Sequence, residues 1–287
     1  MYSKTKRLYA LLFIMVMVAT TVAACGKKEE TKKQTELHVF AAASLKSSME
    51  QIIADYEKEH SDVKVILSAD SSGTLLTQIQ EGYECDIFFS AATKQVDQLE
   101  KDGLIRDGVR KEVLNNQVVL IKGKNAKTEV TSLKDLKKAK SFALAAASVP
   151  VGKYTREALK NIGILDKSME ASDITTKQVS EALGGLEISE QGNVSKVLLA
   201  VAEGSCEVGT VYLSDTYGYG DKVDIIEKVP NTETGKVIYP ACLVVNKEAD
   251  DVKKQASKEF FDYMTGDKAM EVYKQHYFDT DSTNKLR

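Results

Sequence analysis

Short apolar segments alternate with amphipathic segments along most of this chain, and this alternation limits the possible fold more than any other feature. Helical spacing of apolar side chains predicts helices at residues 45–59, 73–81, 94–101, 152–161, 194–203 and 249–264. Short apolar runs predict strands at residues 37–41, 63–68, 85–89, 117–122, 141–146, 207–212, 223–229 and 237–245. Strands that alternate with helices indicate an α/β protein with mainly parallel sheets.

The first 24 residues have the pattern of a secretory signal peptide. Lys4, Lys6 and Arg7 precede an apolar stretch from Leu8 to about Ala19, which is too short for a comfortable membrane span. Residues 22–26, VAACG, resemble the lipobox of bacterial lipoproteins, in which Cys25 would become the acylated N-terminus. A plain signal peptide with a chance cysteine is the alternative. We expect an exported chain, anchored by a lipid on the extracytoplasmic face of the cell membrane.

Residues 25–35 are predicted to be a flexible tether, because this region is charged and poor in apolar side chains. Beyond it, no apolar run is long enough to cross a membrane. The whole chain carries 39 Lys and Arg against 42 Asp and Glu, and no basic tract lies outside the tether. Nucleic acid is therefore not expected as a partner.

Besides Cys25, the chain has three cysteines, at positions 85, 206 and 242. Their number is odd and none belongs to a C-x-x-C pair, so neither a disulfide framework nor a zinc site is indicated. We expect mostly buried thiols.

One short sequence occurs twice. FAAAS at residues 40–44 recurs as LAAAS at 144–148, each time at the end of a predicted strand that leads into a helix. The repeat could arise by chance, since alanine runs are common. It could also mark two similar lobes, each of which presents a narrow strand-to-helix turn to a shared crevice.

Four strand-to-helix junctions combine small side chains with backbone donors, at residues 43–45, 71–73, 150–152 and 193–194. Ser44, the serines at 71–72 and Asn193 are ordinary helix caps when taken singly, and Pro150 suits a first helical turn. Ligands of open α/β sheets, however, bind beyond the carboxyl ends of strands, where helix starts present unpaired N–H groups. Together the junctions therefore predict a ligand site.

The residues at these junctions favour a compact anion. Each helix start carries about half a positive charge, so four converging starts would roughly balance a dianion without Arg or Lys. A fully deprotonated tetrahedral oxyanion needs only donors, whereas hydrogen phosphate also needs an acceptor for its proton. Asp70 is the carboxylate beside a junction, where it could repel a dianion or accept a phosphate proton. We expect it instead to cap the next helix or to face solvent.

The junctions, their order and the later GTVYLSD at residues 209–215 resemble the molybdate-binding lipoproteins of bacterial ABC transporters. The resemblance runs from about Glu36 to the C-terminal helices and includes CDIFFSAA, GKYTREAL, NVSKVLLAVAEG and VIYPACLVV. It implies a periplasmic-binding-protein-like fold of type II, with two α/β lobes and a ligand cleft between them. Lobe one would comprise residues 36–117 and 240–287, and lobe two residues 118–239, with a hinge at the two crossings.

Carried over position by position, the resemblance implies five contacts to the oxyanion. Ser44 and Ser72 would contribute hydroxyl and amide, Val151 and Val194 their amides, and Tyr212 its phenol. The same residues would hold molybdate without any direct ligand to the metal atom, and no cofactor is implied. The P-A-G usual in the family reads PVG at residues 150–152 here, and the preceding loop is shortened around Ser148.

The alanines at 41–43 then have a reason, because larger side chains there would occupy the volume of the ligand. Tyr212 has an alternative reading as a strand-end aromatic with a solvated hydroxyl. Three lysines lie close to the junctions, and we expect them to be solvated and to attract anions only at long range: Lys46, Lys153 and Lys196.

The predicted function is capture of molybdate, and also of tungstate, for delivery to an ABC transporter permease with its ATPase. The protein is expected to be a monomer and not an enzyme, since three His in all and no G-x-S-x-G, H-E-x-x-H, P-loop or G-x-G-x-x-G motif leave no catalytic pair. Two alternatives stay open. The ligand could be another tetrahedral oxyanion, such as sulfate or phosphate, or the chain could be an adhesion or sensor lipoprotein that delivers no cargo.

Overall fold

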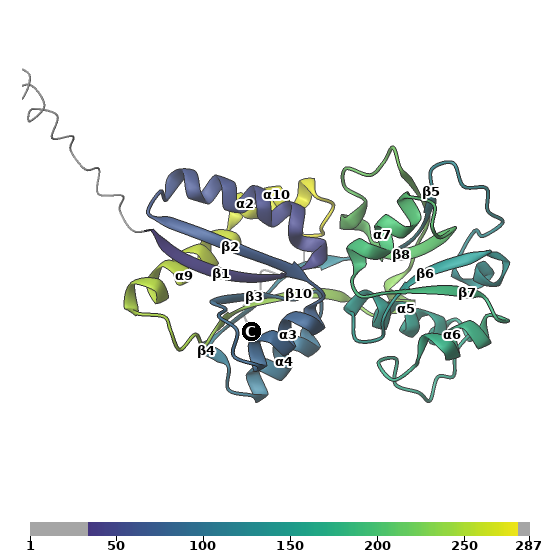
Figure 1. The fold of residues 1–287 in the computed structure, drawn as a ribbon, viewed down its shortest axis with the longest axis horizontal. Helices are drawn as coiled ribbons and strands as arrows, with labels where there is room; N and C mark the ends of the chain where they lie inside the picture. The colour runs from purple at the N-terminus through teal and green to yellow at the C-terminus, as the bar shows by residue number, and fades with distance from the viewer. Residues whose placement is uncertain (1–33, 281–287) are drawn as a thin grey trace, which may run out of the picture. The chain divides into compact units, whose positions relative to one another are not determined.

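The computed structural model describes residues 34–280. The predicted signal peptide, Cys25 and the tether up to Lys33 lie outside the described residues. Within 34–280 the chain forms two five-stranded sheets, each covered by helices (Figure 1). No helix in this range is long and apolar enough to cross a membrane.

The first sheet has the strand order β2-β1-β3-β10-β4. Alternate residues of its strand β1 enter two different cores: Leu37 and Val39 pack with α2 and α9, and Phe40 packs with α3 and α4. Helices α2, α9 and α10 thus cover one face and α3 and α4 the other (Figure 1). The elements are β1 (Thr35–Ala42), η1 (Ala43–Leu45), α2 (Lys46–Glu59), β2 (Val63–Asp70), α3 (Ser72–Gln80), β3 (Ile87–Phe89), α4 (Thr93–Lys101), β4 (Ile105–Asn116), β10 (Val237–Val244), α9 (Asp251–Met264) and α10 (Asp267–Gln275).

The second sheet has the order β7-β6-β8-β5-β9. Helix α7 packs on Gly209 of strand β8, whereas α5 reaches the next residue, Thr210, through a hydrogen bond from Thr155. Because successive strand residues face opposite sides, α5 and α7 lie on opposite faces of this sheet. The elements are β5 (Val118–Gly123), η2 (Leu133–Lys138), β6 (Ser141–Ala145), α5 (Pro150–Asn161), α6 (Thr176–Ala182), β7 (Glu187–Gln191), α7 (Val194–Ala202), β8 (Val208–Tyr212), η3 (Leu213–Thr216), β9 (Val223–Lys228) and α8 (Asn231–Thr234).

The expectation of mainly parallel sheets is wrong. In the first sheet β1 runs parallel to β2 and β3, but β10 runs antiparallel to β3 and β4. In the second sheet β6 is parallel to β7 and β8, but β5 is antiparallel to β8 and β9. The cause is the path of the chain, because β5 follows β4 directly into the second sheet and β10 returns between β3 and β4.

The two strands absent from the predicted set, β4 and β7, both lie at sheet edges. Their sequences, IRDGVRKEVLNN and EISEQ, are rich in charged and polar residues. Edge strands commonly carry charge, which hinders pairing with another chain and also weakens the apolar pattern that marks a buried strand.

The chain passes between the sheets twice. Gln117 separates β4 from β5, and residues 229–236 separate β9 from β10. Residues 237–239 pair with β4 and so belong to the first sheet, although the predicted second segment of lobe one begins at residue 240. At the other end, β1 begins at Thr35, one residue before the predicted start of lobe one. The lobe boundaries given above remain a prediction.

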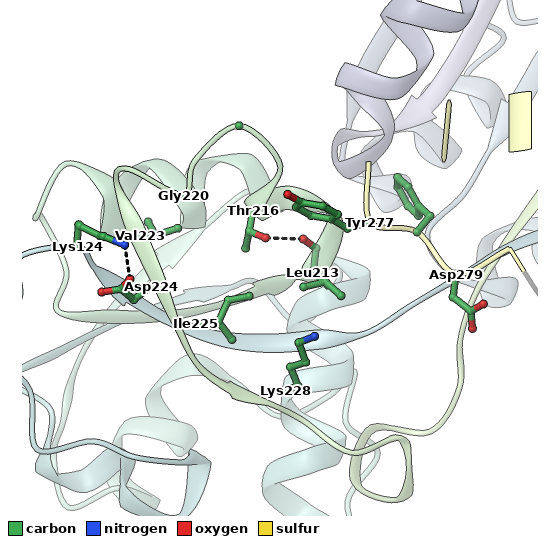
Figure 2. Close-up of a pocket in the computed structure, with 12 residues that line it drawn as sticks. Lys124, Leu213, Thr216, Gly220, Val223, Asp224, Ile225, Lys228, Tyr277 and Asp279 are labelled. Atoms are coloured by element: carbon green, nitrogen blue, oxygen red, sulfur yellow. Dashed lines mark hydrogen bonds and ion pairs between the residues drawn. The ribbon is translucent and has the colours of Figure 1, made fainter. Parts of the chain in front are cut away.

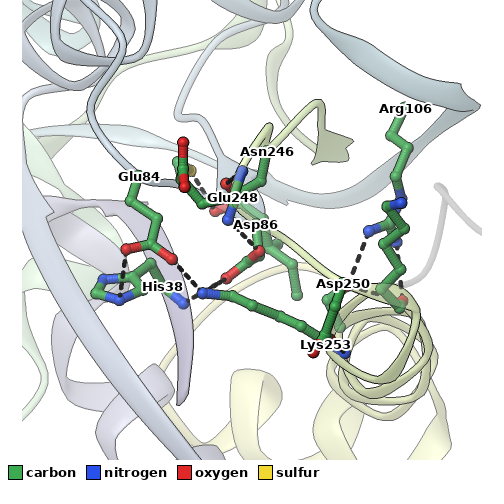
Figure 3. Close-up of polar contacts among 12 residues, drawn as sticks. His38, Glu84, Asp86, Arg106, Asn246, Glu248, Asp250 and Lys253 are labelled. Carbon is green, nitrogen blue, oxygen red and sulfur yellow. Dashed lines mark hydrogen bonds and ion pairs between the residues drawn. The ribbon is translucent and has the colours of Figure 1, made fainter. Parts of the chain in front are cut away.

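A buried carboxylate ties the first sheet together at a distance from the junctions (Figure 3). Asp86 is fully buried and accepts hydrogen bonds from the His38 amide (2.8 Å) and from Asn246 Nδ2 (2.7 Å). Lys253 of α9 lies 3.5 Å from Asp86 and pairs with Glu84, and this bond to Lys253 lowers the pKa of Glu84. Because these partners satisfy the buried charge, the cluster is a structural one.

The three cysteines of the described chain, at positions 85, 206 and 242, are buried free thiols, as expected. Burial raises the pKa of each, so they are protonated and unreactive at neutral pH.

Candidate functional site

All five residues expected to contact an oxyanion line one small cavity of about 10 Å³. Residues of the first sheet and its helices form one side, and residues of α5, α7 and β8 form the other. None of the lining residues is a Lys, Arg or His. The lining residues are Ala42, Ala43, Ser44, Asp70, Ser71, Ser72, Ala91, Val149, Pro150, Val151, Val194 and Tyr212.

Backbone amides reach this cavity from the starts of three helices. Ser72 and Val194 are the first residues of α3 and α7, and Val151 is the second residue of α5. Amides in the first helical turn have no intrahelical acceptor. The side chains of Ser71 and Asn193 accept from the amide of the third residue of their helices, so these caps do not occupy the first amide. No acidic residue lies in the first turn of any of the three, but the Asp70 carboxylate accepts from the Ser71 amide directly before α3.

The cap predicted at Asn193 is confirmed, and Pro150 is the first residue of α5, as expected, with Val149 as the residue before it. Ser44, however, is not a cap. It lies within the 3-10 helix η1, and its hydroxyl forms a buried 2.9 Å hydrogen bond with the Tyr239 hydroxyl. Tyr239 Oη also accepts from Asn116 Nδ2 at 3.2 Å. If Tyr239 donates to Ser44, the Ser44 proton is available to a ligand. Burial raises the pKa of Tyr239 well above its ordinary value, so the phenol keeps its proton.

Ser72 has a comparable arrangement. Its Oγ accepts a 3.0 Å hydrogen bond from the Ala91 amide, which follows strand β3. Because a serine hydroxyl has one donor, and its acceptor side is used here, its proton can be directed at a ligand oxygen.

Tyr212 ends strand β8 with a fully buried ring, and its Oη has no hydrogen-bond partner within residues 34–280. A buried hydroxyl without a partner is costly, so Tyr212 Oη is a candidate ligand contact. Tyr56 Oη also lacks a partner within the described residues, but it does not line this cavity. Burial raises the pKa of Tyr212 well above its ordinary value, so this group is a neutral donor. The alternative of a solvated hydroxyl is wrong. The ring is held edge-to-face by Tyr154 and Tyr239.

The turn that carries Val151 depends on Gly152, which belongs to the predicted junction, and on Arg156, which the sequence analysis missed. A Cβ on Gly152 would collide with the carbonyl oxygens of Ala145 and Ala146, so only glycine lets α5 start this close to β6. Arg156, fully buried one turn later, donates 2.9 Å bonds to the carbonyls of Ala145 and Gly152. Burial lowers the pKa of Arg156 to about 10, which leaves it charged at neutral pH. It therefore fixes the turn and places a positive charge behind it.

Asp70 does not cap a helix, contrary to one expectation, and it is half-buried rather than fully exposed to solvent. It lines the cavity, and Ser71 is the cap of α3. Asp70 Oδ1 accepts from the Ser71 amide at 2.7 Å and from Asn193 Nδ2 at 2.9 Å. The carboxylate is thus engaged by the two cap residues.

Other expectations hold in part. Ala42 and Ala43 line the cavity, whereas Ala41 packs in the core. The repeat at residues 144–148 ends a strand, but Ser148 is exposed and does not line the cavity as Ser44 does. Lys46 and Lys196 are exposed, Lys153 is half-buried, and none of them lines the cavity.

A larger cavity, of about 620 Å³, lies elsewhere, beside β9, η3 and residues 277–279 (Figure 2). Its wall mixes apolar side chains with Lys228 and with Lys124, which is already paired to Asp224 at 2.7 Å. It lacks the convergent donors of the smaller cavity. Within the described range, no cluster of three or more His, Cys, Asp and Glu side chains could hold a metal ion.

Comparisons with known proteins agree with this geometry. A family model described as bacterial extracellular solute-binding protein matches residues 37–279. The chain is 29% identical to YvgL of Bacillus subtilis, assigned as an ABC transporter substrate-binding lipoprotein, over 94% of this chain and 97% of that one. It is 30% identical to the molybdate-binding protein ModA of Escherichia coli, over 93% and 96% of the two chains. A solved substrate-binding domain assigned to a molybdenum ABC transporter of Clostridium difficile is 30% identical, with a TM-score of 0.60 over 85% of this chain and 98% of that one.

Proposed function

Because the chain belongs to the family of bacterial extracellular solute-binding proteins, we propose that it captures molybdate, and equally tungstate, for an ABC transporter. In this proposal the five cavity residues are the contacts: the hydroxyls of Ser44, Ser72 and Tyr212, and the amides of the two serines, Val151 and Val194. The ligand is carried as cargo and is not a cofactor, and the relatives are solute-binding proteins rather than enzymes.

One observation carries the proposal, namely the buried Tyr212 hydroxyl without a partner in a cavity that has no basic side chain. A neutral donor of this kind gains most from a ligand that is only an acceptor, such as a deprotonated tetrahedral oxyanion. Helix starts add positive potential, and buried Arg156 adds a charge that does not itself line the cavity.

Asp70 favours a second candidate, an oxyanion that carries a proton. Hydrogen phosphate could donate its proton to a carboxylate in the cavity wall, whereas molybdate and tungstate could not. Sulfate presents four acceptor oxygens like molybdate, so the donor set alone does not select between them.

The test is calorimetric titration of the ligand-free protein with molybdate, tungstate, sulfate and phosphate at one pH and salt concentration. Because the donor set does not separate sulfate from molybdate, the preference for molybdate rests on the relatives. The proposal expects tight binding of molybdate and tungstate with similar constants, and binding of sulfate and phosphate at least about tenfold weaker, the equivalent of about 1.4 kcal/mol. Preferential binding of phosphate would transfer the assignment to the second candidate. Preferential binding of sulfate would contradict molybdate as the ligand, but it would remain consistent with a site made of neutral donors.

We further propose that Cys25 anchors the protein by a lipid on the extracytoplasmic side of the cell membrane, where it meets the permease as a monomer. The family is extracellular, and YvgL is assigned as a lipoprotein. Metabolic labelling with a fatty acid should mark the parent chain and not a Cys25→Ser variant. A permease gene with an ATPase gene beside this one would support delivery over an adhesion or sensor role.

A further inference from the structure

Two residues at the cavity join elements of different sheets. Asp70 is the last residue of β2 in the first sheet, and Asn193 precedes α7 on the second sheet. Asn193 Nδ2 donates to Asp70 Oδ1 at 2.9 Å, across 123 positions of the sequence. This contact is a direct side-chain bond between the two sheets beside the proposed anion contacts.

Each partner also holds the helix start next to it. Asn193 Oδ1 accepts from the Lys196 amide at 3.0 Å and so caps α7. Asp70 Oδ1 accepts from the Ser71 amide at 2.7 Å, directly before α3. The pair therefore fixes the first residues of α3 and α7, Ser72 and Val194, relative to each other.

A second close approach joins the same two sheets. A Cβ on Gly73 of α3 would lie 2.9 Å from the carbonyl oxygen of Ser148, which precedes α5. Only glycine allows this distance without a shift of the backbone. A 2.9 Å bond between Asp70 and Asn193 requires the two sheets to be this close, and it would break if they moved apart.

We infer that Asp70 and Asn193 form a latch that holds the two sheets together over the bound anion and slows its release. The inference rests on the proposed function, because it states how that site retains its ligand. A carboxylate accepts stronger hydrogen bonds than a neutral oxygen, which suits a latch. Its charge repels a dianion, and the two donors on Oδ1 offset that repulsion. Differences in affinity among variants of one site reside mainly in the dissociation rate, so that rate is the quantity to measure.

The sharpest variant is Asn193→Asp. Aspartate caps a helix as well as asparagine does, so α7 keeps its cap, but a second carboxylate now faces Asp70. Adding Asp70→Asn in the same chain reverses the pair, restores one donor and one acceptor, and returns the net charge to that of the parent. We expect molybdate to dissociate about tenfold faster from Asn193→Asp, and within about threefold of the parent rate from the double variant.

A matched control is Asp102→Asn, at the exposed C-terminal end of α4. It removes one negative charge from a carboxylate that accepts from Gln80 and Gln98 but touches no part of the cavity. Its dissociation rate should equal that of the parent at fixed salt.

A second readout needs no anion. Backbone hydrogen exchange at residues 70–74 and 193–197 should be faster in Asn193→Asp than in the parent and should slow again in the double variant. If the parent binds no molybdate but this exchange pattern holds, the proposed ligand is wrong and the latch stands. If the parent binds molybdate while dissociation and exchange are the same in all variants, the latch is wrong and the proposed function stands.

Discussion

Ser44 and Tyr239 lie 195 positions apart in the sequence, yet their hydroxyl oxygens are 2.9 Å apart in a buried hydrogen bond. Ser44 follows β1, and Tyr239 belongs to β10, which is separated from β1 by β3. Tyr239 does not line the cavity, whereas Ser44 does. The bond to Tyr239 therefore determines the direction in which the Ser44 hydroxyl can donate. Asn116, at the end of β4, extends the chain of bonds to Ser214 of η3 at 2.8 Å.

Tyr239→Phe should therefore weaken molybdate binding. The ring still packs, but the Ser44 hydroxyl loses the donor that orients and polarises it, a loss of about 1 kcal/mol or about fivefold in Kd. Calorimetric titration measures the Kd for molybdate, and a thermal scan without ligand should show little change in the unfolding midpoint. Tyr83→Phe is the control, since Tyr83 is 58% exposed. An unchanged Kd would contradict the role of Tyr239.

Tyr212→Phe should change binding and stability in opposite directions. The variant removes a buried hydroxyl that has no partner, so the ligand-free protein should be as stable as the parent or more stable. Molybdate binding should weaken by about 1–3 kcal/mol, because an oxygen of the dianion loses a charge-assisted bond. Ser44→Ala should cost a similar amount in binding. A loss of stability equal to the loss of binding would show that Tyr212 is only structural.

Gly73→Ala should weaken binding by keeping the sheets apart. The added methyl would meet the Ser148 carbonyl at 2.9 Å, and overpacking of this kind costs about 1–3 kcal/mol. The matched control is Gly220→Ala, because a Cβ there has no atom within 4 Å. The Kd for molybdate and the unfolding midpoint of each variant separate the two effects. If Gly73→Ala bound molybdate with the parent Kd, the close approach of Gly73 to the Ser148 carbonyl would not be needed for binding.

The lysines near the junctions should matter little. Lys46→Ala and Lys196→Ala remove exposed cations that do not line the cavity, so each should cost well under about 1 kcal/mol. Lys153→Ala should behave alike. Their effect should fall on the salt dependence of the association rate, which stopped-flow mixing at several ionic strengths measures. A tenfold loss of affinity in any of the three would indicate a cationic site.

Binding should weaken as the pH rises through neutrality. Desolvation raises the pKa of Asp215 to about 7, while a 2.8 Å bond from the Tyr212 amide acts in the opposite direction. A folded-state pKa above the unfolded value of 3.8 gives stability that is present below about pH 4 and is lost as the pH rises through about 7. Ionised Asp215 also adds negative charge behind Tyr212.

The unfolding midpoint and the molybdate Kd, each measured from pH 5 to pH 8.5, check this expectation. In Asp215→Asn the decline of both between pH 6 and pH 8 should be smaller than in the parent. The same decline in both proteins would assign the pH dependence to another group.

Most of the elements and junctions that could be predicted were indicated by residues close together in the sequence. Helix caps, a proline in a first turn and small residues after strands depend on neighbours a few positions away, so the four junctions and most elements were predicted to within a few residues. The edge strands β4 and β7 were missed because an edge has little apolar surface to bury. The direction of β10 was missed because it depends on where the chain re-enters the first sheet.

The sequence by itself determined the α/β class, the order of most elements and the four junctions that supply the candidate site, since these follow from periodicity and from the residue types at helix starts. Only the tertiary structure decided that Ser44 bonds to Tyr239, that Asp70 bonds to Asn193, and that the Tyr212 hydroxyl is buried without a partner. The physical reason is distance along the chain. A hydrogen bond across more than a hundred positions depends on how sheets pack, and no pattern of neighbouring residues encodes that contact.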